Sequence, residues 1–397
     1  MLKLREFAAN RFLTCCTLLA FFIFGLLHAQ TVGPDSSQTP SFHSKVRVVL
    51  LDVVVTDKDE PVSGLKKEDF QVFEDGAPQK ISYFEEHKGL APTQVKLPSL
   101  PSNVFTNYPV TKSQGAANVL LLDTLNTPMQ DQAFVRGQMI KYLRKLTPGE
   151  RMAVFSLGSR LRILQGFTDN PANLLSVLND KESVGTHASS LLVTDSEKNA
   201  NRELLAHLAM SMASAETIDA VRRFQQDNAD ARNNERVEIT LQALQDLARY
   251  LSEIPGRKNV IWFSSSFPIS VFPHAEETGR VNNAQLYATD VANTAKLLTA
   301  NQVAIYPISA TGLTTDGLYS AAFRRGPSIA QGNRERATNQ IAMESLAKDT
   351  GGEAFYNTNG LAQAVTRVVN EGTHYYTLTY TPTNTKMDGK FRKIHLQ

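Results

Sequence analysis

The residues of this chain that could carry out chemistry do not form an enzymatic motif. Three serines, Ser264 to Ser266, follow an apolar run, but no base stands at an identifiable position relative to them. Gly158-Ser159 lies outside the Gly-x-Ser-x-Gly pattern that presents a hydrolase nucleophile. The histidines are scattered without the pairing of zinc sites, and no Gly-rich phosphate-binding motif is present. The sequence therefore predicts a protein that is not an enzyme and that binds no small-molecule cofactor.

Oxygen-bearing side chains gather instead at the end of one apolar run. Val119 to Leu122 is typical of a buried strand, and the stretch from Asp123 to Thr127 follows it directly. In an open parallel sheet, ligands bind in the crevice at the carboxyl ends of the strands, where the strand order reverses. We therefore expect Asp123 and its neighbours to face such a crevice.

The elements that would position this crevice begin at Asn118. From there apolar strands alternate with amphipathic helices, which predicts a doubly wound, mainly parallel α/β sheet covered on both faces. The expected strands are 119–122, 151–157, 161–166 (in a hairpin with 151–157), 259–263, 303–308 and 353–356. The expected helices are 131–146, 238–253, 290–300, 340–350 and 361–371. Residues 179–236 form a long insertion, helical in places and polar elsewhere. It is either a lid that contacts a partner or, as the default interpretation, a mobile surface excursion; composition alone does not choose between them.

Short strands flank this domain on both sides. Residues 46–55, 70–73 and 80–84 are predicted strands, with Glu74-Asp75-Gly76 as a hairpin turn between the last two. They bury too little surface to fold alone. Residues 374–380 and 391–396 predict a second hairpin, which we expect to return to the first strands. Together, residues 45–88 and 372–397 would form a small β-sandwich, joined to the α/β domain by a Pro-rich linker, 89–117. Because Gln397 ends in mid-strand, the sequence is expected to be a fragment.

The N-terminus predicts export. Basic residues precede an apolar run from Phe12 to Leu27, and Ala29 offers a small residue for cleavage, so residues 1–29 are predicted to be a signal peptide. The run is shorter than the roughly 17–25 residues of a spanning helix, and an uncleaved membrane anchor is the alternative. Cys15 and Cys16, the only cysteines, lie within it, so disulfides do not stabilise the exported protein. The mature chain would be secreted or periplasmic, beginning with a disordered linker, 30–44.

Charge excludes two classes of partner. Beyond Ala29 the acidic and basic side chains balance, and no basic stripe or polybasic segment is present. Nucleic acids and anionic lipids attract such segments. We therefore expect no nucleic-acid partner, and a membrane contact only if the signal segment stays uncleaved.

Several segments resemble the von Willebrand factor type A domain. They are the strand ending at Asp123, the strand 151–157, the helix opening at Thr240 and the stretch from Leu346 to Tyr356. The flanking segments, including Val72-Phe73-Glu74-Asp75-Gly76 and Tyr375-Tyr376, are similar to the "VWFA-related" proteins of Acidobacteria. This resemblance covers nearly the whole mature chain and implies no established activity.

The resemblance implies a divalent cation held by Asp-x-Ser-x-Ser, a Thr from a second loop and an Asp from a third. Asp123, Thr127 and Thr240 match ligand positions, whereas Leu125 and Ser265 stand where the family has Ser and Asp. Losing a carboxylate opposite a divalent ion weakens binding, and Asn126 could supply an amide oxygen or serve as a turn residue. Two alternatives follow. Either Mg²⁺, Ca²⁺ or Mn²⁺ is held weakly, or the site is vestigial and Thr127, Thr240 and Ser265 donate hydrogen bonds to Asp123.

The resemblance implies a non-enzymatic binding or adhesion module. It would recognise a protein or cell-surface ligand at this degenerate site, through Asp123, Asn126, Thr127, Thr240 and Ser265. The alternative is a structural or assembly subunit of an envelope complex in which the metal site is vestigial. Fold analogy alone supports both hypotheses.

Overall fold

A computed structural model describes residues 47–58, 60–88, 93–94, 111–112, 116–146, 150–180, 189–266, 283–310, 329–356, 360–386, 388, 390 and 392–397. The predicted signal peptide, the linker 30–44 and most of the linker 89–117 lie outside these residues. Within the described part, residues 48 onward belong to one compact unit. None of its helices is long and apolar enough to span a bilayer.

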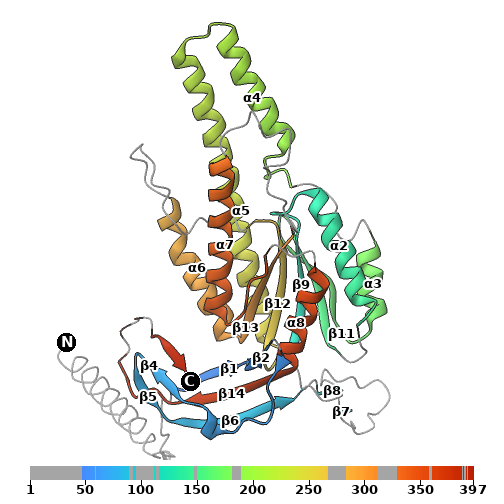
Figure 1. Cartoon of the computed structure of the whole chain (residues 1–397), viewed down its shortest axis with the longest axis vertical. Coiled ribbons are helices and arrows are strands. Elements are labelled where there is room, and N and C mark those ends of the chain that lie inside the picture. Colours follow the sequence, from blue (N-terminus) through green and yellow to red (C-terminus); the bar gives the residue numbers. More distant parts are fainter. Residues whose placement is uncertain are drawn as a thin grey trace, which may run out of the picture. The chain divides into compact units, whose positions relative to one another are not determined.

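A five-stranded, mainly parallel sheet forms the centre of this unit (Figure 1). In sheet order its strands are β11 (Leu161–Thr168), β10 (Met152–Leu157), β9 (Ala117–Asp123), β12 (Lys258–Ser264) and β13 (Val303–Ser309). Only β11 runs antiparallel, paired with β10 as a hairpin. Phe355 adds a single parallel bridge to Ile308 beside β13. The predicted α/β fold with a mostly parallel sheet is confirmed.

Helices cover both faces of the sheet. One face packs on α2 (Met129–Leu143), α3 (Pro171–Asn179) and α8 (Leu361–Thr373). The other packs on α5 (Ala215–Ser252), α6 (Asn283–Ala300) and α7 (Ile329–Thr350). Alternate residues of each strand enter opposite clusters, as Leu120 and Leu121 of β9 do. A strand buried on both faces must be apolar throughout, which is why these strands were visible in the sequence.

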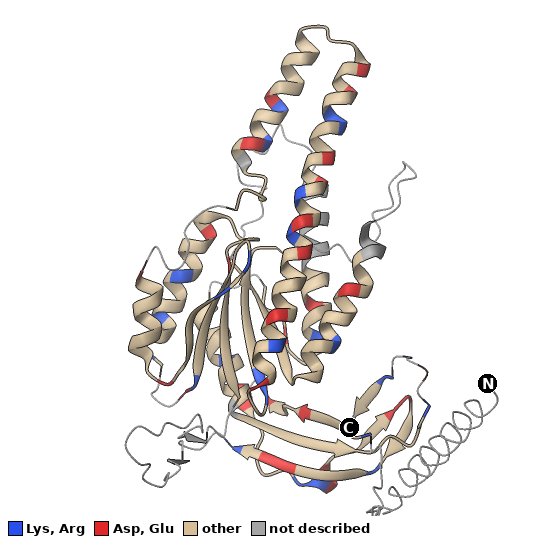
Figure 2. Ribbon diagram, turned by 180° about the vertical axis from the view of Figure 1, so that it is seen from behind, with Lys and Arg blue, Asp and Glu red and all other residues tan. Residues whose placement is uncertain are grey.

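The insertion forms a helical hairpin, which we call the arm (residues 195–236). It consists of α4 (Asp195–Met210) and the first half of α5, which lie side by side in Figure 1. The caps Thr194 and Ser214 accept hydrogen bonds from backbone N–H groups of the first turns. Both signs of charge are distributed along the two helices (Figure 2). The helix predicted to begin at Glu238 thus begins at Ala215, because polar residues continue it beyond the sheet.

Strands that precede the α/β domain pair with strands that follow it. The strand β14 (His374–Tyr380) lies between β1 (Val49–Val53) and β6 (Ile81–Lys88), antiparallel to both. A second sheet contains β15 (Ile394–Leu396), β4 (Val72–Glu74) and β5 (Ala77–Gln79). Two-residue pairs join β2 (Thr56–Asp57) to β3 (Glu60–Pro61), and β7 (Thr93–Gln94) to β8 (Thr111–Lys112) within the predicted linker.

Two predicted hairpins are wrong. β14 and β15 belong to different sheets, because the nearly fully buried β14 is a central strand that takes partners on both sides. The strand at 70–73 was expected to pair with 80–84, but β4 pairs with β5 instead. Asp75 and Gly76 both have positive φ, as a two-residue hairpin turn requires, and that turn fixes the partner as the residues directly after it.

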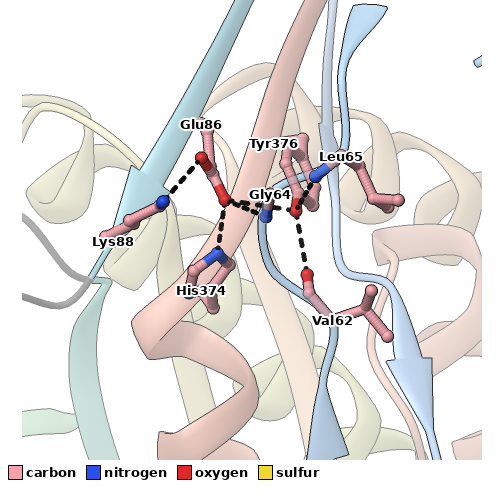
Figure 3. A network of polar contacts seen from close by, with 7 residues as sticks. All are labelled: Val62, Gly64, Leu65, Glu86, Lys88, His374 and Tyr376. Atoms are coloured by element: carbon pink, nitrogen blue, oxygen red, sulfur yellow. Dashed lines mark hydrogen bonds and ion pairs between the residues drawn. The ribbon is translucent and has the colours of Figure 1, made fainter. Parts of the chain in front are cut away.

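Glu86, on β6, holds the sheet formed by β1, β14 and β6 to the loop that follows β3 (Figure 3). Its carboxylate accepts hydrogen bonds from the backbone N–H of Gly64 (2.6 Å) and from His374 (3.0 Å), and it pairs with Lys88 (3.1 Å). These contacts, the backbone bond first, lower the pKa of Glu86 to about 2. The Tyr376 hydroxyl lies beside the same carboxylate and donates to the carbonyl of Val62 (2.9 Å).

A buried guanidinium joins these strands to the central sheet. Arg257, just before β12, donates to the Tyr306 hydroxyl (2.9 Å) and to the carbonyl oxygens of Gly351 (3.0 Å) and Asp52 (3.5 Å). The Asp52 carboxylate in turn accepts from Gln302 (2.8 Å) and Thr377 (2.7 Å). Residues from β1, β13 and β14 therefore depend on one another for hydrogen bonds at the amino end of the sheet.

Replacing Arg257 by alanine is expected to lower the free energy of unfolding by about 1–3 kcal/mol, because buried acceptors lose their donor. The matched control is Arg222→Ala, which removes an exposed arginine paired with Asp219 and should cost less than about 1 kcal/mol. Urea denaturation measures both. Equal effects of the two substitutions would contradict a structural role for Arg257.

Candidate functional site

The carboxyl ends of β9 and β12 meet the arm helix α5 at one place. Asp123 ends β9, Ser264 ends β12, and Thr240 lies on α5. The site residues predicted from sequence lie together here. Asp123, Asn126, Thr127 and Thr240 are buried and Ser265 is half-buried, so their polar atoms must find partners within the protein.

The Asp123 carboxylate accepts hydrogen bonds from four donors. Oδ1 accepts the backbone N–H of Asn126 (2.8 Å). Oδ2 accepts from the Asn126 amide (2.9 Å), the Ser264 hydroxyl (2.8 Å) and the Trp262 indole (3.2 Å). The sequence-based hypothesis of a vestigial site named Thr127, Thr240 and Ser265 as donors, and that assignment is wrong. Those side chains bond elsewhere, because the turn after β9 brings Asn126 back onto Asp123.

Burial is the main influence on the acidity of Asp123. It raises the pKa from 3.8 to about 6, against the opposing effects of the Asn126 and Ser264 hydrogen bonds and of the nearby Arg236 charge. An ionised carboxylate is costly in the interior even when it is well hydrogen-bonded. The pKa of Asp123 is therefore closer to neutral pH than that of an exposed aspartate.

Asn126 connects the carboxylate to α5. Its amide nitrogen also donates to the Thr240 hydroxyl (3.0 Å), and its amide oxygen accepts from Nε of Arg236 (2.9 Å). Arg236 reaches further, with Nη2 donating to the Ser266 hydroxyl (3.0 Å). Burial lowers the pKa of Arg236, and the Asp123 charge opposes that effect. Asn126 is thus the centre of the network, beyond the turn or ligand roles inferred for it from sequence.

Thr127 and Ser265 form a second group of contacts. The Thr127 hydroxyl accepts the backbone N–H of Ser265 (3.1 Å), and the Ser265 hydroxyl donates to the Asp131 carboxylate in the first turn of α2 (3.0 Å). Partial burial raises the pKa of Asp131. These bonds hold the end of β12 against the start of α2.

A pocket lies beside Asp123, between Gln132 and Phe263. Its volume of about 240 Å³ includes open solvent. The enclosed part of this pocket holds no more than about one water molecule, so it does not form an enclosed small-molecule site.

The residues as arranged do not fit a divalent cation. Mg²⁺ requires hard oxygen ligands in an octahedron. Here both Asp123 oxygens and the hydroxyl oxygens of Thr127 and Thr240 already accept hydrogen bonds, and Leu125 has no ligand atom. The described residues also contain no cluster of three His, Cys, Asp or Glu side chains suited to a metal. Weak Mg²⁺, Ca²⁺ or Mn²⁺ binding stays a prediction from the resemblance.

Sequence reasoning missed three of the residues that contact this network. Arg236 was assigned to the polar insertion, although it precedes Thr240 by four residues and so lies on the same face of a helix. Trp262 was assigned to the core, where it is fully buried, and nothing in the sequence revealed its bond to Asp123. Ser264 was noted only as a nucleophile without a base.

Comparison with known proteins shows similarity in structure but not in sequence. No family model matches the chain, and no curated protein does. Among solved structures, an aerotolerance-related membrane protein from Bacteroides fragilis is 11% identical, with 65% of this chain and 98% of that one covered and a TM-score of 0.35. A von Willebrand factor type A protein from Catenulispora acidiphila is 10% identical, with 82% and 71% covered and a TM-score of 0.34. The PilB minor pilin from Streptococcus sanguinis is 9% identical, with 65% and 60% covered and a TM-score of 0.33.

One of these similar structures is named a von Willebrand factor type A protein. At these identities and TM-scores the likeness carries no argument about the function of this chain. The ligand, partner and activity of this chain have to be argued from its own residues.

Trp262, the only tryptophan, reports on the titration of Asp123. We expect its fluorescence to change with a midpoint near pH 6, and Ser264→Ala to move the midpoint upward because a bond that favours the carboxylate is lost. The folded state binds this proton more tightly than the unfolded state. Asp123 should therefore make the free energy of unfolding fall as pH rises from about 3.8 to about 6.

The control is Asp123→Asn, which should abolish the fluorescence transition. A transition that persists in this variant, or a wild-type midpoint near 4, would contradict a raised pKa at Asp123.

Proposed function

We propose that this chain is an extracytoplasmic binding or assembly module, without enzymatic activity, that holds a protein partner at the carboxyl end of its parallel sheet. The contact would involve the arm and the adjoining crevice. The basic N-terminal residues and apolar run that predict export support the extracytoplasmic location.

The observation that carries this proposal is the exposure of the arm. None of its described side chains is buried, and burial along α5 begins only at Val237. Large apolar side chains point to solvent, with exposed fractions of 68% for Phe224, 82% for Met210 and 93% for Met212. Most stability of a helix in a protein comes from packing of an apolar face, which the arm by itself does not bury. A partner would supply that packing, and methionine adapts to varied surfaces.

The charge of the arm favours a protein as the partner. Acidic and basic residues are interspersed along α4 and α5, and two described ion pairs lie within the arm, Arg222 with Asp219 (2.8 Å) and Arg232 with Glu197 (2.9 Å). Nucleic acids and anionic lipid surfaces select for an excess of basic residues. A mixed surface with exposed methionine and phenylalanine is better matched to a protein interface.

The crevice would take part through its rim. Direct ligand contact at Asp123, Asn126, Thr127 and Thr240 requires these buried side chains to open. Ser265 and Ser266 are half-buried at the same end of the sheet and are closer to solvent. We therefore place first contact at these serines and on the arm, with the buried network behind them as support.

An assembly subunit is the second candidate function. The closed hydrogen-bond network around Asp123 favours it, because a vestigial crevice leaves the arm as the main contact surface. In that case the arm would pack against another subunit of an envelope complex or against a second copy of this chain.

We also interpret the flanking strands, residues 45–88 and 372–397, as a β-sandwich into which residues 118–371 are inserted. The position of β14 between β1 and β6 supports this interpretation. A hydrophobic core cluster supports it too, because the cluster contains residues from both antiparallel sheets, such as Tyr376 from the β1–β14–β6 sheet and Val72 from the β15–β4–β5 sheet. The arm would then be carried on a rigid base formed from both ends of the chain.

A photo-crosslinking amino acid at position 212 is expected to capture a partner when the full chain is produced in its native host. The matched control is position 163, since the Ile163 side chain is about half exposed on β11, away from the arm. The combined variant Met210→Ser, Phe224→Ser should reduce the position-212 adduct about tenfold, as loss of central apolar contacts does at interfaces.

Thermal stability should be unchanged in the variant, because both side chains are exposed. An adduct of twice the chain mass would favour self-assembly over a foreign partner. The same adducts from positions 163 and 212, or no adduct at 212, would contradict recognition by the arm.

A further inference from the structure

One cationic side chain of the arm reaches into the crevice. Arg236, at the boundary between the exposed and buried halves of α5, donates from Nε to the Asn126 amide oxygen (2.9 Å) and from Nη2 to the Ser266 hydroxyl (3.0 Å). The next residue, Val237, is the first buried residue of the helix. Arg236 therefore lies where the arm leaves the sheet.

The hydrogen bonds connect Arg236 to Asp123 through one intermediate residue. Asn126 accepts from the guanidinium at its oxygen and donates to the carboxylate from both its amide and its backbone nitrogen. A chain of this kind, donor to acceptor throughout, is polarised in one direction and strengthens cooperatively. The positive end of the chain is on α5 and the negative end is on β9.

Arg236 is also the only cation that contacts this network among the described residues. The other charged groups there are the carboxylates of Asp123 and Asp131. A buried carboxylate needs compensating charge, and the opposing effects of Arg236 and Asp123 on each other's pKa agree with their proximity. The oxygens at the metal-ligand positions already accept hydrogen bonds. The charge of the Asp123 carboxylate is therefore compensated by the guanidinium of Arg236.

We propose that the guanidinium of Arg236 is the built-in cation of the crevice, a tethered replacement for a divalent metal ion, and that it fixes the arm to the sheet. The crevice then operates without added metal. This proposal concerns what holds the crevice together, and it stands whether or not the arm binds a partner.

Arginine suits this position better than lysine does. Its planar guanidinium presents separate N–H groups to the Asn126 oxygen and the Ser266 hydroxyl at once, and its charge persists across the physiological pH range. Arg232, one turn earlier on α5, provides an internal comparison. It pairs with Glu197 within the arm, and among the described residues it has no hydrogen bond or ion pair to the crevice.

A double-mutant cycle between Arg236→Ala and Asp123→Asn tests the proposal in the full chain. We expect Arg236→Ala to raise the unfolding equilibrium constant at least tenfold more in wild type than in the Asp123→Asn background, because the guanidinium compensates a charge that the asparagine lacks. The control cycle pairs Arg232→Ala with Asp123→Asn and should show no coupling. If Arg236→Ala does not fold, Arg236→Gln and Arg236→Lys replace it. The cycle with the neutral glutamine should then give a large coupling free energy with Asp123→Asn, and the cycle with the charged lysine a small one.

Equal effects of the Arg236 substitution in both backgrounds would overturn the proposal, because packing alone would then explain its role. A second measurement is titration of Mn²⁺ into the wild-type chain. We expect no saturable binding up to millimolar Mn²⁺. Saturable binding that Asp123→Ala abolishes would show that metal, and not Arg236, supplies the positive charge.

Discussion

The structure depends on the burial of one carboxylate at the end of the central strand β9. Asp123 lies under the crevice with both oxygens accepting hydrogen bonds, from Asn126 in the turn after β9 and from Trp262 and Ser264 of β12. An uncompensated charge in this position would cost several kcal/mol. The donors are therefore a constraint on the fold, because β12 must be in register with β9 for Trp262 and Ser264 to reach the carboxylate. The turn at Asn126 and the position of α5 are tied to the same requirement.

The opposite end of the sheet carries the complementary arrangement. There the buried charge is the cation Arg257, and its partners come from β1, β13 and the turn after α7. Each end of the parallel sheet thus contains a buried ionic group with hydrogen-bond partners in a neighbouring part of the protein, Asp123 at the carboxyl end and Arg257 at the amino end. Arg257 orients the antiparallel strands contributed by both ends of the chain, and the network around Asp123 orients the arm. The apolar layers between them provide stability but little directional information, since hydrophobic packing is not directional.

The sequence predicted those features that local pattern controls. Strands such as β9 and β12 were evident because burial on both faces makes them apolar throughout, and the Asp75-Gly76 turn was evident from its residue types. The return of the C-terminal strands to the first strands was also expected, but the individual partners were not, because β14 was assigned to a hairpin with β15 and instead lies between β1 and β6. The start of α5 was missed because its first half buries nothing. The resemblance placed Asp123 and Thr240 together, but the bonds of Arg236 and Trp262 depend on side-chain geometry that no motif encodes.

A tethered guanidinium and a bound metal ion place different demands on the same crevice. A metal must be captured from solution, so its contribution varies with the ionic medium, and an open coordination position lets a partner's carboxylate complete its shell. The charge of Arg236 is part of α5 and is always present, but it can leave the crevice only if the helix moves. A helix of 38 residues spans about 57 Å, so the exposed tip of the arm and the side chain bonded to Asn126 belong to one continuous element. A tethered charge therefore makes the crevice depend on the position of α5, whereas a bound metal would make it depend on the ionic medium.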